Sequence, residues 1–193
     1  MRFKNTLLSG LLAVIVAGVI AMGGGAAEGA DKPFPAFGSG PVEVRLYTDY
    51  FCPPCRALEP LVEPILKEML KKNQIRLTLV DVPNTPNSPF YARRFLYALK
   101  AKHSLEQAFL VRNTLIEASL SEDGKKPDRL EGIFKAKGIP YEVFDLKPLF
   151  ARYNALLTED GIDRTPTCVI VKGGQKNKFI GKDDILKAVK ALQ

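Results

Sequence analysis

The sequence predicts an α/β domain with a central mixed sheet flanked by helices, and three observations lead to this fold class. A strand pattern at 42–47 is followed by an amphipathic helix and a second strand pattern at 75–80. The stretch at about 84–160 is helical in character, with apolar residues at three- and four-residue steps. Two short strand patterns, at 168–171 and 178–180, then precede a terminal helix. The order is therefore strand–helix–strand, a helical insertion, and strand–strand–helix, with the first two strands parallel.

The length and composition fit one globular domain. The chain has 193 residues, of which 46% are hydrophobic and 25% charged, a balance that excludes wholesale disorder. Its 3 cysteines are too few for a small scaffold held together by disulfides. The net charge is +7, but lysine and arginine are interleaved with acidic residues and form no basic stripe. No nucleic-acid partner is therefore expected.

Residues 1–27 are expected to be a targeting segment. Arg2 and Lys4 precede an uncharged apolar stretch at 7–22, and small residues follow it as far as Ala27. This order is typical of an export signal. The apolar stretch is shorter than the roughly twenty residues of a spanning helix, although an uncleaved N-terminal anchor is an alternative. In either case we expect a periplasmic or otherwise extracytoplasmic domain, where disulfides can form and persist.

The remainder of the chain divides into a tether and one domain. Residues 28–41 are rich in Gly, Pro and Ala and are expected to be a tether. The domain is expected to cover 42–193, with its helical insertion at about 84–160.

Local signals predict where the helices of the insertion begin. Ser88 is expected to cap a helix that has Pro89 in its first turn. Ser104 and Gln107 have the spacing of a capping box at the start of the next helix. A further helix is expected over 141–157.

The cysteine pair Cys52 and Cys55 follows the first strand directly, at the start of a helix. Unpaired N–H groups and the positive end of the helix dipole favour a thiolate on the first sulfur. We therefore expect Cys52 to attack as the exposed sulfur and Cys55, one turn further, to resolve the mixed disulfide. A static structural disulfide is an alternative. A zinc site would need Cys168 and His103 as its other ligands, and neither a metal nor another cofactor is expected.

Two motifs and the insertion between them carry a family resemblance. The first motif is the segment 47–56, with Pro60 eight residues after its first cysteine, and the second is Thr165-Pro166-Thr167 at the entry to a strand. Together they resemble the active-site helix and the cis-proline loop of thioredoxin-fold proteins. The helical insertion resembles that of the DsbA-like branch. The resemblance implies that Pro166 lies in cis against the cysteine pair and that Thr165 offers backbone hydrogen bonds to a bound peptide.

The resemblance covers about residues 42–192 and implies a function. It implies a monomeric, exported thiol–disulfide oxidoreductase that introduces disulfides into cysteine-containing exported proteins. A quinone-linked membrane protein of the DsbB or vitamin K epoxide reductase kind would reoxidise it. Two alternatives remain: a thiol reductase supplied with electrons by a membrane donor, for example in cytochrome c maturation, and a non-enzymatic peptide-binding or chaperone module.

Two positions depart from the family pattern. The family often has a buried acidic residue six positions before the first cysteine, where this chain has Leu46. Glu59 is a candidate for the missing proton relay, and its alternative is a solvated helix glutamate. The DsbA type usually carries a histidine where this chain has Pro54. Because Pro53 and Pro54 lack an N–H, we expect the thiolate of Cys52 to be stabilised less than in the DsbA type. We therefore expect a redox potential inside the span of roughly −270 to −120 mV.

The third cysteine, Cys168, is two residues beyond Pro166 on a strand, so both side chains are expected on the same face. A free cysteine commonly behaves as a small buried hydrophobe. We therefore expect Cys168 to be inert in the core, and a third redox thiol near the pair is the alternative.

Overall fold

A computed structural model of the chain describes residues 35–193. The expected targeting segment at 1–27 and the first part of the expected tether, 28–34, lie outside the described residues. In the part that is described, no helix is both long enough and apolar enough to cross a lipid bilayer.

A five-stranded mixed sheet forms the centre of the domain, with the strand order β1-β3-β2-β4-β5. The parallel pairing expected for the first strand–helix–strand unit is confirmed, since β2 runs parallel to β3. All the other neighbours in the sheet are antiparallel. The strands are β1 (Ala36–Phe37), β2 (Val42–Thr48), β3 (Ile75–Asp81), β4 (Thr167–Lys172) and β5 (Gln175–Ile180).

Strand β1 corrects part of the expected tether. It lies inside the range 28–41 and pairs with β3 at the edge of the sheet. The side chain of Phe37 is buried, and the carbonyl of Pro35 accepts a hydrogen bond from the N–H of Leu79 at 3.2 Å. Burial of the Phe37 side chain stabilises this segment as a strand, although the Gly, Pro and Ala residues around it are typical of a flexible tether.

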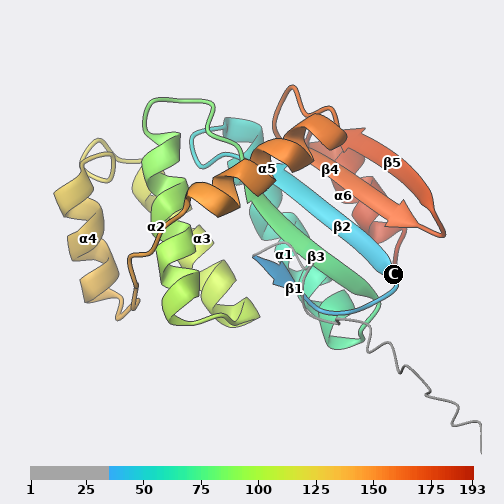
Figure 1. Cartoon of the computed structure of the whole chain (residues 1–193), viewed down its shortest axis with the longest axis horizontal. Coiled ribbons are helices and arrows are strands. Elements are labelled where there is room, and N and C mark those ends of the chain that lie inside the picture. Colours follow the sequence, from blue (N-terminus) through green and yellow to red (C-terminus); the bar gives the residue numbers. More distant parts are fainter. Residues whose placement is uncertain (1–34) are drawn as a thin grey trace, which may run out of the picture. The chain divides into compact units, whose positions relative to one another are not determined.

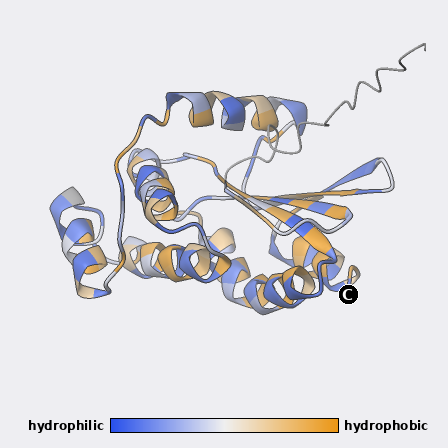
Figure 2. Ribbon diagram, turned by 60° about the horizontal axis from the view of Figure 1, so that its bottom comes forward, coloured by the Kyte–Doolittle hydropathy of each residue, from blue (hydrophilic) through white to orange (hydrophobic). Residues whose placement is uncertain are grey.

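Helices cover both faces of the sheet. Figures 1 and 2 show α1 and α6 on one face and α5 on the other, while α2, α3 and α4 lie beside the sheet. In Figure 2 the helices are banded in hydrophilic and hydrophobic colours, as amphipathic helices with one buried face are. The predicted fold class is confirmed. The helices are α1 (Pro53–Lys71), α2 (Ser88–Ala101), α3 (Leu105–Ser119), α4 (Pro127–Ala136), α5 (Lys147–Glu159) and α6 (Lys182–Lys190).

One helix of the insertion starts later than expected. The range 141–157 was expected to be helical throughout, but α5 begins only at Lys147. Pro148 occupies the first turn of α5. Because a proline in a helix interior loses a hydrogen bond and clashes with the preceding turn, the helix starts just before it.

The caps of α2 and α3 differ in how well they were predicted. The N-cap of α3 is Ser104, whose side chain accepts a hydrogen bond from the N–H of Gln107 at 3.1 Å, as expected. The N-cap of α2 is Asn87, so Ser88 is the first helical residue and not the cap. The Ser88 hydroxyl is instead bound to the carboxylate of Asp49 at 2.6 Å, a contact between distant segments that outweighs the local preference.

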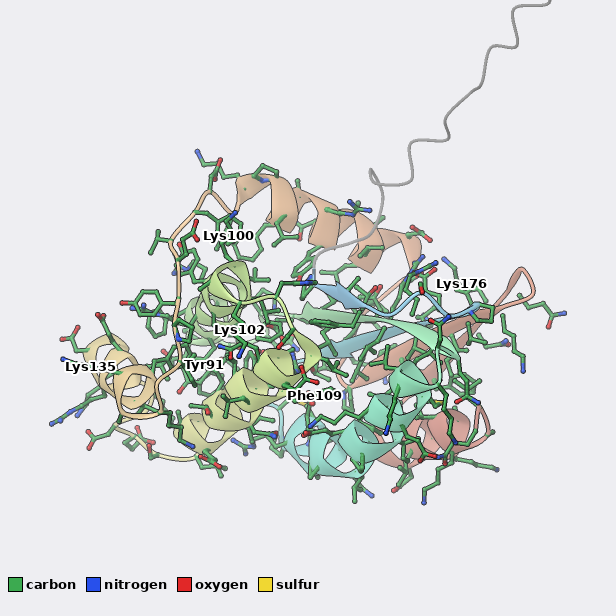
Figure 3. All side chains as sticks on the ribbon, turned by 90° about the horizontal axis from the view of Figure 1, so that it is seen from below. Tyr91, Lys100, Lys102, Phe109, Lys135 and Lys176 are labelled. Carbon is green, nitrogen blue, oxygen red and sulfur yellow. The ribbon has the colours of Figure 1, made fainter. Side chains whose placement is uncertain are left out.

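Helix α3 joins the insertion to the sheet domain. Phe109 of α3 is buried beside α1, with the Lys67 ammonium 4.9 Å from the centre of its ring (Figure 3). On α2, the hydroxyl of the buried Tyr91 donates to the carbonyl of Gly124 at 2.7 Å. The apolar residues of the insertion and of the sheet form one continuous core. The insertion is therefore part of the same folding unit as the sheet.

A buried ion cluster strengthens this junction. Arg112 of α3, 1% exposed, forms an ion pair with Glu59 of α1 and a second one at 2.8 Å with Asp81 at the end of β3. The hydroxyl of Tyr50 donates to Asp81 at 3.0 Å. Burial raises the pKa of Asp81, and the neighbouring Arg112 opposes that rise. Charges removed from water in this way are tolerated only while they remain paired.

Replacing the arginine is expected to destabilise the fold strongly. Arg112→Met keeps the apolar bulk but leaves Glu59 and Asp81 as two neighbouring buried carboxylates. The free energy of unfolding should fall by about 3–5 kcal/mol, as for other buried pairs that lose one partner. Urea denaturation followed by circular dichroism measures the change.

A matched control is Lys137→Met, which breaks the surface pair of Lys137 with Glu117. This change should lower the free energy of unfolding by less than about 1 kcal/mol, because exposed ion pairs contribute little to stability. Equal losses of stability in the two variants would contradict the assignment of the buried cluster.

Candidate active site

Cys52 lies at the N-terminus of α1, at the carboxyl end of β2. It is the N-cap of the helix, with φ −82° and ψ 113°, and its side chain is partly exposed. Its backbone is fixed on both sides, because its N–H donates to the carbonyl of Asp49 at 3.2 Å and its carbonyl accepts from Arg56 at 3.1 Å. Pro53 and Pro54 are the first two helical residues and are exposed. Neither proline has an N–H, so this helix end offers its sulfur fewer donors than other helix ends do.

Cys55 lies one turn further along α1 and is only 1% exposed. Burial raises the pKa of its thiol, and the adjacent Cys52 sulfur acts in the same direction. The nearby backbone of Asp49 and side chain of Thr165 oppose this rise in pKa. The structure holds all three cysteines as free thiols. The pair thus consists of one sulfur that a partner can reach and one that it cannot.

The loop before β4 lies against this pair. The Thr165–Pro166 peptide bond is cis. The Sγ of Cys52 donates to the carbonyl oxygen of Thr165 at 3.4 Å. The carbonyl of Pro166 accepts a hydrogen bond at 2.9 Å from Gly181, whose φ of +85° favours glycine. The structure therefore brings together four of the predicted site residues: Cys52, Cys55, Thr165 and Pro166.

A buried carboxylate that the sequence analysis missed organises the loops around the pair. Asp49, 3% exposed, accepts hydrogen bonds from the N–H of Phe51 at 2.6 Å and the N–H of Asn84 at 2.9 Å. It also accepts from the hydroxyl of Ser88 at 2.6 Å. The side chain of Asn84 in turn donates to the hydroxyl of Thr165 at 3.0 Å. A signal was present, because polar residues that follow neighbouring parallel strands meet at one edge of the sheet.

The structure places Glu59 away from solvent, so the interpretation as a solvated helix glutamate is wrong. The side chain of Glu59 is 2% exposed and accepts hydrogen bonds from Arg112 and from the hydroxyl of Thr48. The position of the family's acidic residue, Leu46, is buried in β2 opposite Cys168. Glu59 therefore belongs to the buried ion cluster around Arg112.

The third cysteine lies in the core. Cys168 is 0% exposed in β4, and burial raises the pKa of its thiol to about 12. His103 is exposed, and its ring stacks on that of Phe37 with the ring centres 5.0 Å apart. Within residues 35–193, no group of three His, Cys, Asp or Glu side chains is arranged to hold a metal ion.

These features are a cysteine pair at the start of a helix and a cis-proline loop beside it, on a thioredoxin fold. The partly exposed Cys52 begins a helix, the buried Cys55 follows one turn later, and the carbonyl before a cis-proline lies beside the first sulfur. Residues 38–191 match the family model described as thioredoxin, and the chain belongs to this family. The predicted resemblance is thereby confirmed.

Solved structures share the fold at low sequence identity. A putative protein-disulfide isomerase from Pseudomonas syringae is 15% identical, with a TM-score of 0.65 over 82% of this chain and 97% of that one. Wolbachia pipientis α-DsbA1 is 14% identical, with a TM-score of 0.63 over 81% of this chain and 87% of that one. Proteus mirabilis ScsC is 18% identical, with a TM-score of 0.62 over 82% and 69% of the two chains. No curated protein sequence matches the chain.

The different environments of the three thiols predict their order of modification. In the reduced, folded protein at neutral pH, iodoacetamide should alkylate Cys52 alone. Cys55 and Cys168 are buried, and their raised pKa values keep them as thiols. Intact-mass spectrometry should show one adduct in the native protein and three after denaturation.

The Cys52→Ser variant is the matched control and should take up no adduct while folded. An adduct on folded Cys52→Ser, or two adducts on the native protein, would show that a second thiol is reactive.

Proposed function

We propose that the protein is an extracytoplasmic thiol–disulfide oxidoreductase that introduces disulfides into other exported proteins through the Cys52–Cys55 pair. The observation that carries this proposal is the asymmetry of the pair beside the cis-proline loop. An exposed sulfur can exchange with a partner, and a buried sulfur one turn away can close or release the bond. A static structural disulfide requires neither an accessible sulfur nor a peptide-binding carbonyl beside it.

The exchange takes place in two steps that balance without a cofactor. A thiolate of the substrate attacks the Sγ of Cys52, the Cys52–Cys55 bond breaks, and its electron pair goes to the sulfur of Cys55. The second thiolate of the substrate then attacks its own sulfur in the mixed disulfide and releases Cys52 as a thiolate. The substrate leaves oxidised, and the enzyme is left with two reduced cysteines.

An exposed apolar face adjoins the reactive sulfur and suits unfolded substrates. The first three turns of α1 present side chains to solvent at helical spacing, so they lie along one face. Newly exported chains expose apolar segments that could rest on such a face while a cysteine approaches Cys52. The exposed residues are Pro53, Pro54, Ala57, Pro60, Leu61 and Pro64.

Reoxidation requires a partner, which we assign to a quinone-linked membrane protein of the DsbB or vitamin K epoxide reductase kind. The apolar N-terminal stretch at 7–22 supports export, and an uncleaved segment would hold the domain near such a partner. We further propose that the enzyme acts as a monomer. Thr165 would hold the substrate backbone through its main-chain groups, and Pro166 would shape that loop.

The reverse direction of electron flow is a second candidate because of Pro53 and Pro54. They occupy the first two positions of α1 and remove two amide donors from the neighbourhood of Cys52. Less stabilisation of the reduced form makes the disulfide a weaker oxidant. A membrane-fed reductase of exported disulfides would use the same two cysteines.

The redox potential separates these two functions. We expect the full-length chain, equilibrated with glutathione buffers, to have a potential inside the span of roughly −270 to −120 mV. A value near or above about −180 mV supports the oxidase, and a value near −270 mV supports the reductase. Mass spectrometry after acid trapping measures the oxidised fraction, and Cys168→Ala should give the same potential.

A non-enzymatic peptide-binding module would keep its biological function in the Cys52→Ser variant. The oxidase requires that this variant fails to oxidise a peptide dithiol. Full biological function with serine at this position would refute the redox proposal.

That Glu59 acts as a proton relay stays a prediction, and the pH dependence of the attack by Cys55 tests it. The rate at which Cys55 attacks a mixed disulfide at Cys52 should rise with pH, because the raised pKa of Cys55 leaves little thiolate near neutrality. If Glu59 accepts that proton, Glu59→Gln should slow the step by about 10²-fold at pH 7, a typical contribution of a general base. The difference should vanish at high pH, where hydroxide removes the proton directly.

Quenched-flow kinetics from pH 6 to about pH 10 give the profile, and the difference between wild type and Glu59→Gln should narrow toward the upper end of this range, nearer the raised pKa of Cys55. Identical profiles, together with a lower melting temperature, would restrict Glu59 to the ion cluster.

A further inference from the structure

Strand β5 forms one edge of the sheet, and the outer side of its backbone is unpaired. Within the part of the chain that the structure describes, β5 is the last strand of the sheet and pairs with β4 on its inner side. All of its residues except Phe179 are exposed. An edge strand of this kind offers a row of N–H and C=O groups to an extended chain that reaches it.

The register of the β4–β5 pair tells which residues carry these free groups. In an antiparallel pair, residues that exchange hydrogen bonds alternate with residues that do not. Gly181 donates to the carbonyl of Pro166 at 2.9 Å, so every second residue of β5 counted back from Gly181 is bonded to β4. The residues that direct their N–H and C=O groups to the free edge are therefore Lys176, Lys178 and Ile180.

Lysine side chains on an edge strand commonly keep other strands away, but those of β5 are bound elsewhere. The Nζ of Lys176 forms an ion pair with Asp160 at 2.7 Å. The Nζ of Lys178 donates to the carbonyl of Gly161 at 2.9 Å. Both charges are held at the C-terminal end of α5, over the face of the sheet that α5 covers (Figure 1). They do not guard the edge itself.

An open groove lies beside this edge on the opposite face, between the β4–β5 hairpin and α6. Its volume is about 440 Å³, within the range of pockets that hold a ligand. Two lysines, one asparagine and one aspartate form part of its lining. The apolar residues that line it are Ile170, Phe179, Ala188, Ala191 and Leu192. The side chains of a strand added to β5 would alternate between the two faces, so every second one would point to the side of this groove.

The edge leads to the reactive cysteine. Strand β5 ends at Ile180, and the next residue, Gly181, is bonded to the carbonyl of Pro166. The preceding carbonyl, that of Thr165, accepts from the Sγ of Cys52 at 3.4 Å. A chain that lies along β5 and continues past Gly181 therefore arrives at the loop beside the first sulfur.

We propose that the free edge of β5 and the groove beside it bind an extended segment of the substrate by strand addition, at a distance from the cysteine that reacts with Cys52. This inference rests on the proposed function. The occupant is an unfolded polypeptide with apolar side chains at alternate positions, because a row of free N–H and C=O groups is complementary to another extended backbone. From Asn177 to Gly181 the edge spans about 13 Å, so a spacer of about six residues would connect the two contacts.

The experiment compares two thiol probes on the oxidised, full-length protein. The long probe is a synthetic peptide in which a Gly/Ser spacer of about six residues joins one cysteine to a segment of alternating valine and threonine. It is made with the segment before and after the cysteine, because the free edge accepts a strand of either direction. The short probe has the same cysteine and spacer without the segment. Acid quenching and mass spectrometry give the rate of mixed-disulfide formation, and we expect the long probe to react about tenfold faster.

A pair of variants at Lys178 tests the backbone contact. Lys178→Pro removes one N–H from the free edge, where an edge strand tolerates proline. It should lower the rate of the long probe about fivefold, as expected for one lost hydrogen bond, and leave the short probe unchanged. Lys178→Ala is the matched control, because it loses the same side-chain contact with Gly161 but keeps the N–H. It should react with both probes at the wild-type rate.

A second pair of variants tests the groove without altering the β5 backbone. Ala188→Leu fills the groove and should lower the rate of the long probe at least about fivefold. Lys190→Leu adds an equal side chain at an exposed position of α6 outside the lining and should have no effect.

Equal rates for the two probes in the wild-type protein would overturn the proposal. Long-probe rates that are the same in both members of each pair of variants would also overturn it. A dimer that Lys178→Pro dissociates would assign the edge to a second copy of the chain and would refute substrate binding there. Failure of the proposed function would look different, because the short probe would then form no mixed disulfide at Cys52.

Discussion

The parallel pairing of β2 with β3 is the constraint on which the site depends. Since the two strands run in the same direction, the chain leaves both of them at one edge of the sheet. The loop after β2 supplies Asp49 and Cys52, and the loop after β3 supplies Asn84. The antiparallel strand β4 enters the sheet at that same edge and brings the cis-proline loop with it. Three segments far apart in sequence therefore meet at one end of the sheet.

The helical insertion contributes a buried positive charge to the domain in addition to apolar packing. Arg112 comes from α3 and is buried between two acidic residues of the sheet domain. Such a cluster adds little net stability compared with apolar packing, but it tolerates only one arrangement of its members. It therefore fixes how the insertion sits beside α1 and the end of β3. Apolar contacts alone would allow more freedom of register between the helices.

The sequence was sufficient for the features that depend on local pattern. Hydrophobic periodicity predicted the sheet, most helices and the insertion, and the spacing of Cys52 and Cys55 predicted one exposed and one buried sulfur. The sequence was insufficient where the deciding contact is distant. The Ser88 hydroxyl binds Asp49, so Ser88 is a helical residue and not the cap. Pairing with β3 places Phe37 in a strand and not in the expected tether. The burial of Glu59 depends on Arg112, which lies 53 positions away.

The chain has an odd number of cysteines, so one thiol has no partner within the Cys52–Cys55 pair. An accessible thiol near a second cysteine pair can exchange with it, and peroxides oxidise an accessible thiolate stepwise to irreversible products. Cys168 is enclosed in β4 between Leu46 and Phe179, with a pKa near 12, so it offers neither access nor a thiolate. The chain can carry a third sulfur without risking a scrambled pairing. Burial therefore keeps the Cys168 thiol apart from the partly exposed Cys52.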